Sequence, residues 1–343
     1  MIRMYPLFRK PIILNILPVG FIFLCVLNCS QRTEPTSPGA DPSPTGSFSW
    51  ITTHKPQTAA INKLIKSPDN NLYAATNGDG ILRSTDTGEN WEFYNNSLSD
   101  TLIQCLACDS AGNLFAGTLH QGLFIQSSGQ SSWMQTDLTG TAIYSLGVNP
   151  EGTIFAATAD TVYRSIDSGQ TWESLPTNLI DRPVICFFFF PGGRIFAGTY
   201  ARGIITSNDS GLSWSSNPIS QITILSLGSN ALSHILAGTM AQGGLISKDD
   251  GLNWDLLTNG FGESAYQFIL NSQGYVFCAG LGDGIRRSLN HGEDWERINA
   301  NLSDLYVYSL VLDQQEYLLA GTETGQIFKS NYSSRQRELP GID

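Results

Sequence analysis

The sequence contains little charge, and basic residues are especially few. Only 14% of the 343 residues are Asp, Glu, Lys or Arg, and 30 acidic residues outnumber 19 basic ones, giving a formal net charge of −11. A protein that binds nucleic acid needs a basic surface to meet the phosphates. The composition therefore argues against nucleic acid as a partner and is typical of a soluble acidic protein.

Cysteine and histidine are also scarce, with six and four residues. Cys105 and Cys108 are three residues apart in an expected strand, where their side chains point to opposite faces, so we expect core residues rather than a metal or redox motif. Five further residues stand singly, without metal-ligand spacing: Cys186, Cys278, His120, His234 and His291. We therefore expect no disulfide framework, no metal and no cofactor.

Sustained helical periodicity is absent from residue 48 onwards, and regularly spaced tryptophans are present instead. All seven lie 39 to 42 residues apart: Trp50, Trp91, Trp133, Trp172, Trp214, Trp254 and Trp295. Each period reads as four short strands separated by Gly, Asn, Asp and Ser, as in residues 91–94, 102–108, 114–118 and 123–125. A fixed period of this length indicates a repeat architecture, here all-β. Phe187–Phe190 is expected to belong to an inner strand buried on both faces.

The tryptophans end a recurring motif, Ser-x-Asp-x-Gly-x-x-Trp. Its Asp and Trp positions, with Asn in the fifth copy, are Asp86 and Trp91, Asp167 and Trp172, Asp209 and Trp214, Asp249 and Trp254, and Asn290 and Trp295. A short Asp side chain can accept hydrogen bonds from nearby backbone N–H groups, and Gly suits a positive φ. The Trp then starts the next strand and buries a large apolar area. We expect these residues to be architectural, tying the last two strands of each unit together.

The motif resembles the Asp-box, or bacterial neuraminidase repeat, and its regular array resembles Asp-box β-propellers such as the sialidases and the photosystem-assembly factor. The resemblance covers roughly residues 48 to 332. It implies an all-β, seven-bladed β-propeller with four-stranded antiparallel blades. Two units depart from it, since the turn before Trp133 lacks the Asp and the last unit, 330–334, has no Trp after it.

The missing outer strand of the last unit suggests how the ring closes. Residues 50–54 resemble the strand that begins at each Trp, yet no repeat precedes them. We expect this N-terminal strand to complete the last blade beside Ile327 and Phe328, because closure removes exposed sheet edges. The propeller is then expected at 48–332 and a C-terminal tail at 333–343.

Residues 1–29 differ from the rest and read as a signal segment. Arg3, Arg9 and Lys10 precede an apolar run, 11–27, that ends before Cys29. This pattern resembles a bacterial lipoprotein signal peptide, with Cys29 as the lipidated residue; an uncleaved transmembrane helix is the alternative. Residues 30–47 are rich in Pro, Ser and Thr and are expected to be a disordered linker. The expected location is a bacterial cell envelope, with lipid as the only contact with the membrane.

Ligand recognition is expected at the mouth of the central channel, as the resemblance implies. The candidate ligand-binding residues lie in loops that follow the Gly-Thr segments: Asp79, His120, Asp160, Tyr200, Arg202, Gln242, Asp283 and Glu323. We expect a monomeric, non-catalytic propeller that binds an envelope or extracellular protein or glycan.

A glycoside hydrolase is the alternative, because acids among these loops could form a pair, which such enzymes use. A sialidase is disfavoured, since Arg182 and Arg202 have no third arginine beside them in these loops. Xyloglucanase-type enzymes place two propellers around a cleft, and one propeller fits here. The photosystem-assembly factor uses an arginine patch that this acidic chain does not obviously carry.

Overall fold

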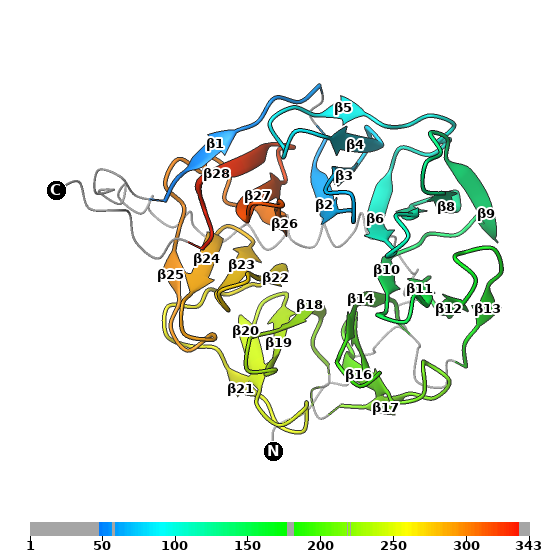
Figure 1. Ribbon diagram of the computed structural model, residues 1–343. Helices are drawn as coiled ribbons and strands as arrows, with labels where there is room; N and C mark the ends of the chain where they lie inside the picture. Colours follow the sequence, from blue (N-terminus) through cyan, green and yellow to red (C-terminus); the bar gives the residue numbers. More distant parts are fainter. Residues whose placement is uncertain (1–47, 57–58, 177–181, 218, 220, 336–343) are drawn as a thin grey trace, which may run out of the picture. The chain divides into compact units, whose positions relative to one another are not determined.

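A computed structural model describes residues 48–56, 59–176, 182–217, 219 and 221–335. The expected signal segment 1–29 with Cys29, the linker 30–47 and most of the expected tail lie outside the described residues. Those described form seven four-stranded antiparallel sheets arranged in a ring (Figure 1). The predicted fold class, a seven-bladed all-β propeller, is confirmed.

The blades are numbered here by their innermost strands in chain order. Blade 1 contains β2 (Ile61–Lys66), β3 (Leu72–Thr76), β4 (Ile81–Ser84) and β5 (Glu92–Phe93). Blade 2 contains β6 (Ile103–Cys108), β7 (Leu114–Thr118), β8 (Gly122–Gln126) and β9 (Met134–Thr139). Blade 3 contains β10 (Ser145–Val148), β11 (Ile154–Ala157), β12 (Val162–Ser165) and β13 (Glu173–Ser174).

Blade 4 contains β14 (Val184–Phe189), β15 (Ile195–Thr199), β16 (Gly203–Ser207) and β17 (Ser215–Ser216). Blade 5 contains β18 (Ile224–Ser229), β19 (Ile235–Thr239), β20 (Gly244–Ser247) and β21 (Asp255–Leu256). Blade 6 contains β22 (Gln267–Leu270), β23 (Val276–Gly280), β24 (Gly284–Ser288) and β25 (Glu296–Arg297). Blade 7 contains β26 (Val307–Leu312), β27 (Tyr317–Thr322), β28 (Ile327–Ser333) and β1 (Trp50–Thr52).

The second strands show why the repeat needs small residues. Every residue of β7 is buried, and its sequence is Leu-Phe-Ala-Gly-Thr. A Cβ on Gly117 would lie 2.5 Å from the Cys105 Sγ and 2.8 Å from Ile143, a residue of the connection into blade 3. Since real Cβ contacts are not so short, glycine is required there by the close approach of adjacent blades.

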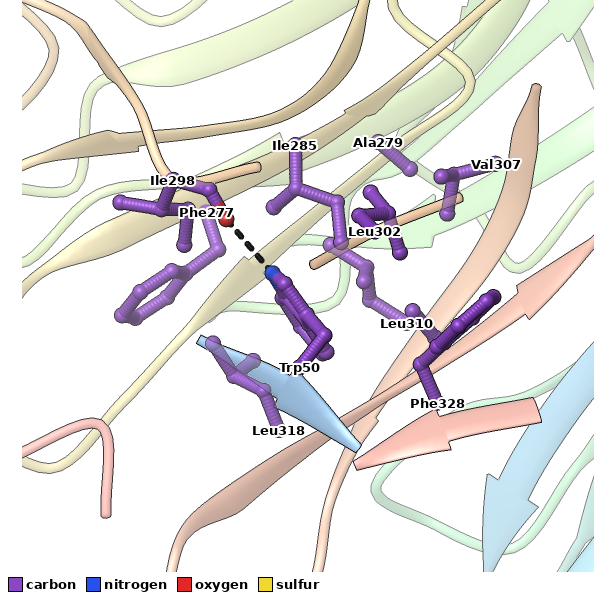
Figure 2. Packing of buried hydrophobic residues seen from close by; sticks show 11 residues of the cluster. Trp50, Phe277, Ala279, Ile285, Ile298, Leu302, Val307, Leu310, Leu318 and Phe328 are labelled. Atoms are coloured by element: carbon purple, nitrogen blue, oxygen red, sulfur yellow. Dashed lines mark hydrogen bonds between the residues drawn. The ribbon is translucent and has the colours of Figure 1, made fainter. Parts of the chain in front are cut away.

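The ring closes through the N-terminal strand, as predicted. β1 pairs antiparallel with β28, and Trp50 lies opposite Ser330. Figure 2 shows the Trp50 ring among buried residues of blades 6 and 7, with its indole nitrogen 2.5 Å from the Ile298 carbonyl oxygen. The Thr53 amide extends the pairing by donating to Ile327 O at 3.0 Å. Trp50 is 3% exposed in this contact, so burial of its large apolar side chain makes β1 an integral part of blade 7.

The antiparallel order gives the ring two distinct rims. We call one the turn rim: it carries the turns between first and second strands and the motif turns between third and fourth strands. The other, the loop rim, carries the loops between second and third strands and the connections between blades. The Ser49 amide donates to Asn331 Oδ1 at 2.7 Å, in blade 7's equivalent of a motif turn. The described chain therefore begins at the turn rim.

The five motif turns share the hydrogen bonds of their Ser and Asp (or Asn) side chains, and in four of them the Trp indole also donates to the turn glycine. The exception is Trp214, whose buried indole nitrogen has no hydrogen-bond partner among the described residues. In the first, Ser84 Oγ donates to Asp86 Oδ1 at 2.8 Å and accepts from the Gly88 amide at 2.9 Å. Asp86 Oδ1 also accepts from the Asn90 amide, and the Trp91 indole donates to Gly88 O. This leaves the polar groups of the tight turn paired while the indole packs inside.

Candidate functional site

The eight candidate ligand-binding residues all lie on the loop rim, in the loops between second and third strands. Blade 4 contributes Tyr200 and Arg202, and each other blade contributes one residue. The side chains of His120, Asp160 and Gln242 are exposed, and the others are half-buried. The ring thus distributes these residues around one face rather than gathering them in one cluster.

Several carboxylates on this rim hold the loops in place. Asp79 Oδ2 accepts from the Ala59 amide at 3.0 Å, and Asp100 Oδ2 accepts from the His120 amide at 3.0 Å. Asp304 Oδ2 likewise accepts from the Thr324 amide and hydroxyl, at 3.0 and 2.7 Å. Each of these bonds joins a connection between blades to a loop 20 residues away along the chain. We call these carboxylates staples, because charged acceptors on backbone N–H groups fix loop geometry.

Asp283 is the most heavily engaged of the candidate residues. Its carboxylate lies 3.2 Å from Arg286 and 3.0 Å from Arg297, and it accepts from the Glu263 amide at 3.3 Å. Arg286 in turn donates to the Gly260 carbonyl oxygen. Both oxygens of this carboxylate are thus engaged, and the bond to the Glu263 amide makes it a fourth staple.

Glu323 has a different environment, beside two tyrosines. Burial, and then the Glu323 charge, raise the pKa of Tyr266 to about 12. The same two causes raise the pKa of Tyr308, which is hydrogen-bonded to Glu323 and packs against Tyr266 with ring centroids 5.0 Å apart and planes tilted by 40°. A raised pKa keeps the phenols protonated, which is the reverse of what a tyrosine nucleophile needs. These hydroxyls are suited to donating hydrogen bonds.

The first strands contribute a lysine and two thiols. Burial lowers the pKa of Lys63, an effect partly offset by Cys186 and Cys105 on two other blades. Burial raises the pKa of both thiols to about 12, so they stay protonated. The Cys105 Sγ donates to Ile143 O at 3.4 Å, which links blade 2 to blade 3. These cysteines are therefore structural, as the core assignment from sequence expects.

Two candidate carboxylates on the loop rim contact side-chain hydroxyls. Asp160 interacts with the hydroxyls of Thr158 and Thr161, at 3.4 and 3.3 Å, and Glu323 with Tyr308. Within the described part of the chain, no three or more His, Cys, Asp or Glu side chains come together as a metal site would require. The rim offers hydroxyls, a guanidinium and an aromatic ring, which are groups that recognise polar surfaces.

A cavity of about 420 Å³ lies on the other face, at the turn-rim ends of β6, β10 and β14. Its lining residues are Cys108, Ser110, Val148, Asn149, Pro150, Gly152, Phe187, Phe188 and Phe189. The expectation that Phe187–Phe190 is buried on both faces was wrong, because all four side chains are only half-buried. The strand does lie innermost, but its end is at the mouth of the ring, where no further blade covers it.

Comparisons with known proteins relate the chain to several propellers through fold. No family model matches the sequence, and no curated protein matches it. The extracellular domain of a hybrid two-component system from B. thetaiotaomicron aligns at TM-score 0.69 and 15% identity, over 84% of this chain and 40% of that one. A GH74 xyloglucanase from Xanthomonas campestris aligns at 0.67 and 15%, over 81% and 53%. YCF48 bound to D1 peptide aligns at 0.65 and 15%, over 86% and 99%.

These neighbours include an enzyme, an extracellular domain of a two-component system and a protein bound to a peptide, so fold alone leaves the activity open. The chain spans about two fifths of that extracellular domain and about half of the xyloglucanase. Among the described residues, no helix has the length and apolar content that crossing a membrane takes. The comparisons establish what this chain shares with these proteins: a propeller built from repeated four-stranded sheets.

Proposed function

We propose that this chain is a non-catalytic propeller that binds an envelope or extracellular protein or glycan through its loop rim. The observation that carries the proposal is the use of the rim carboxylates as staples. Asp79 and Asp283 accept hydrogen bonds from backbone amides, and two arginines also flank Asp283. Rigid loops that present varied polar side chains suit recognition, because little entropy is lost when a partner docks.

The lipid anchor on Cys29 is part of the proposal. The described chain starts on the turn rim, where Ser49 bonds Asn331. A tether through residues 30–47 would then attach at the turn rim and leave the loop rim free to meet a partner. Metabolic palmitate labelling that disappears in Cys29→Ser is the expected result; labelling that persists in that variant would contradict the anchor.

Capture of partners from envelope extracts tests the binding function. Tyr200→Ala, on the loop rim, should reduce capture, whereas Leu212→Ala, at an exposed position of a motif turn, should leave it unchanged. Equal capture by the Tyr200 variant and the wild-type chain would remove Tyr200 from the binding surface. Equal loss in both variants would indicate nonspecific capture.

A glycoside hydrolase remains the second candidate, because one structural neighbour is a xyloglucanase. Asp160 and Glu323 differ from the staples in what they contact. Asp160 contacts the hydroxyls of Thr158 and Thr161, and Glu323 contacts the hydroxyl of Tyr308. A glycosidase panel on the purified chain should give no turnover. Turnover that Asp160→Asn or Glu323→Gln abolishes would reverse the assignment.

A further inference from the structure

The cavity on the turn rim has an aromatic wall. Phe187 and Phe189 stack with centroids 6.2 Å apart and an interplanar angle of 14°. Gly147, in blade 3, makes room for them, since a Cβ there would lie 2.7 Å from the Phe189 ring. Val148 and Pro150 add aliphatic surface, and Phe188 lines the same cavity. A half-exposed apolar wall of this kind is suited to receive an apolar side chain.

The edge of the cavity is acidic. Cys108 and Ser110 line it, and Asp109 lies between them in the chain, with its carboxylate accepting from the Ala111 and Asn113 amides at 3.0 and 2.8 Å. Burial raises the pKa of the Cys108 thiol to about 12, and the negative charge of Asp109 acts in the same direction. Glu151 is exposed and lies between two lining residues, Pro150 and Gly152.

Two basic residues lie at the neighbouring turns. Lys66, at the end of β2, is exposed. Arg194, in the turn of blade 4, is directed to blade 5, where it donates to the Asp250 carbonyl oxygen at 2.9 Å. The whole chain carries a net charge of −11, so the long-range potential at this edge has the same sign.

We propose that this cavity is a second binding site, separate from the loop rim, for a protein segment in which an aromatic or aliphatic side chain neighbours Lys or Arg. The apolar side chain enters between Phe188 and Val148, and a neighbouring cation meets Glu151. Aromatic faces also attract cations, so the wall and the edge favour the same ligand. An acidic segment is repelled by the same carboxylates.

The test uses two matched peptides, acetyl-Gly-Lys-Phe-Lys-Gly-amide and acetyl-Gly-Glu-Phe-Glu-Gly-amide, titrated into the whole chain by NMR with labelled phenylalanine. The Lys peptide should bind about tenfold more tightly than the Glu peptide, and the difference should shrink as salt is added. Glu151→Lys should weaken the Lys peptide about fivefold, whereas the control Asp255→Lys, on exposed outer strand β21, should not. Ser110→Trp should block the cavity.

Equal binding of the two peptides, or an unchanged affinity in Glu151→Lys, overturns the proposal. An equal loss in Asp255→Lys also overturns it, because overall charge alone would then explain the effect. A folded Ser110→Trp variant that binds the peptide as before would place the site elsewhere. Partner capture through the loop rim is measured on the same variants and should be unaffected, so failure here leaves the proposed function separately testable.

Discussion

Individual residues of the motif turns show how a tight turn is made from short side chains. Asp167 accepts from the Thr171 amide and hydroxyl and from the Ser165 hydroxyl. These bonds, that of the Thr171 side chain first, lower the pKa of Asp167 to about 2. The pKa values of Asp209 and Asp249 are lowered in the same way, with bonds from Ser213 and Asn253 as the leading causes. The repeated acid is thus kept ionised by its own turn.

Acid unfolding should report these bonds. The carboxyl of Asp167 has a folded pKa of about 2, against about 3.9 when unfolded, so the unfolded chain takes up protons first as pH falls. Its contribution to stability is complete above about pH 4 and is lost as the pH falls towards 2. Asp167→Asn should reduce the proton uptake on unfolding in that window by up to about one proton. Urea melts from pH 5 to pH 2 measure it; the same pH dependence in variant and wild type would contradict the assignment.

The fifth motif turn exchanges its donor and acceptor. Asn290 Oδ1 keeps the bonds from Ser288 and from the Asp294 amide, and Asn290 Nδ2 donates to Asp294 Oδ2 at 2.8 Å. In the first turn, by contrast, Asn90 Nδ2 donates to Asp86 Oδ2. The fifth turn therefore retains the acid–amide pair with the roles reversed.

A double-mutant cycle tests this exchange. Asn290→Asp places two carboxylates face to face and should lower the free energy of unfolding by about 1 kcal/mol at pH 7. Adding Asp294→Asn restores the arrangement of the first turn and should recover most of the loss. Chemical denaturation of the three variants measures the coupling, and a double variant no more stable than Asn290→Asp would show that the pair is unimportant.

At the level of elements, the outer strands join adjacent blades. Six outer strands start directly after a Trp, and β1 starts with one; each of these Trp side chains is buried or half-buried. The Trp133 amide donates to Asn96 O, and the Trp295 amide to Asn259 O, in both cases on the preceding blade. The Trp50 amide makes the corresponding bond to Ala300 O, in the connection from blade 6. β1 therefore takes the place of an outer strand both in its pairing and in its bond to the preceding blade.

Trp50 should therefore contribute as much stability as a core residue. Its side chain is 3% exposed among buried residues of blades 6 and 7. Trp50→Ala should lower the free energy of unfolding by about 3–5 kcal/mol, the usual range for a buried tryptophan. Ile51→Ala is the matched control, because Ile51 is 58% exposed on the same strand, and its effect should stay within about 0.5 kcal/mol. Equal effects in thermal or urea melts would mean that the strand is not packed as described.

The sequence predicts elements well where chemistry repeats and poorly where it does not. Seven tryptophans at a near-constant interval set the blade number, and the Trp without a preceding repeat indicated the closing strand. The role of Asp283 could not be foreseen, because its partners Arg297 and Glu263 lie 14 and 20 residues away in the sequence and meet it only after folding. The Phe187–Phe190 run was misjudged because hydrophobicity does not tell whether the end of an inner strand is covered by another residue or opens at the mouth of the ring.

Considered as a whole, the described chain is a closed ring with two chemically different faces. On the loop rim, carboxylates such as Asp100 and Asp304 fasten loops to blade connections. On the turn rim, the turns between first and second strands of blades 2 and 3 border the aromatic cavity beside Phe188. Closure matters for both faces, because an open ring would free blade 7 from its outer strand and expose an unpaired sheet edge. Each proposed surface depends on the ring being held as one body.

Hydrogen exchange of the amides at residues 50–53 tests this closure most directly. The Trp50 and Thr53 amides donate to Ala300 O and Ile327 O, each at 3.0 Å. If β1 completes blade 7, these amides should be protected as strongly as those of β27 and should exchange only when the whole ring unfolds. Exchange of residues 50–53 within seconds, while β27 stays protected, would contradict the account.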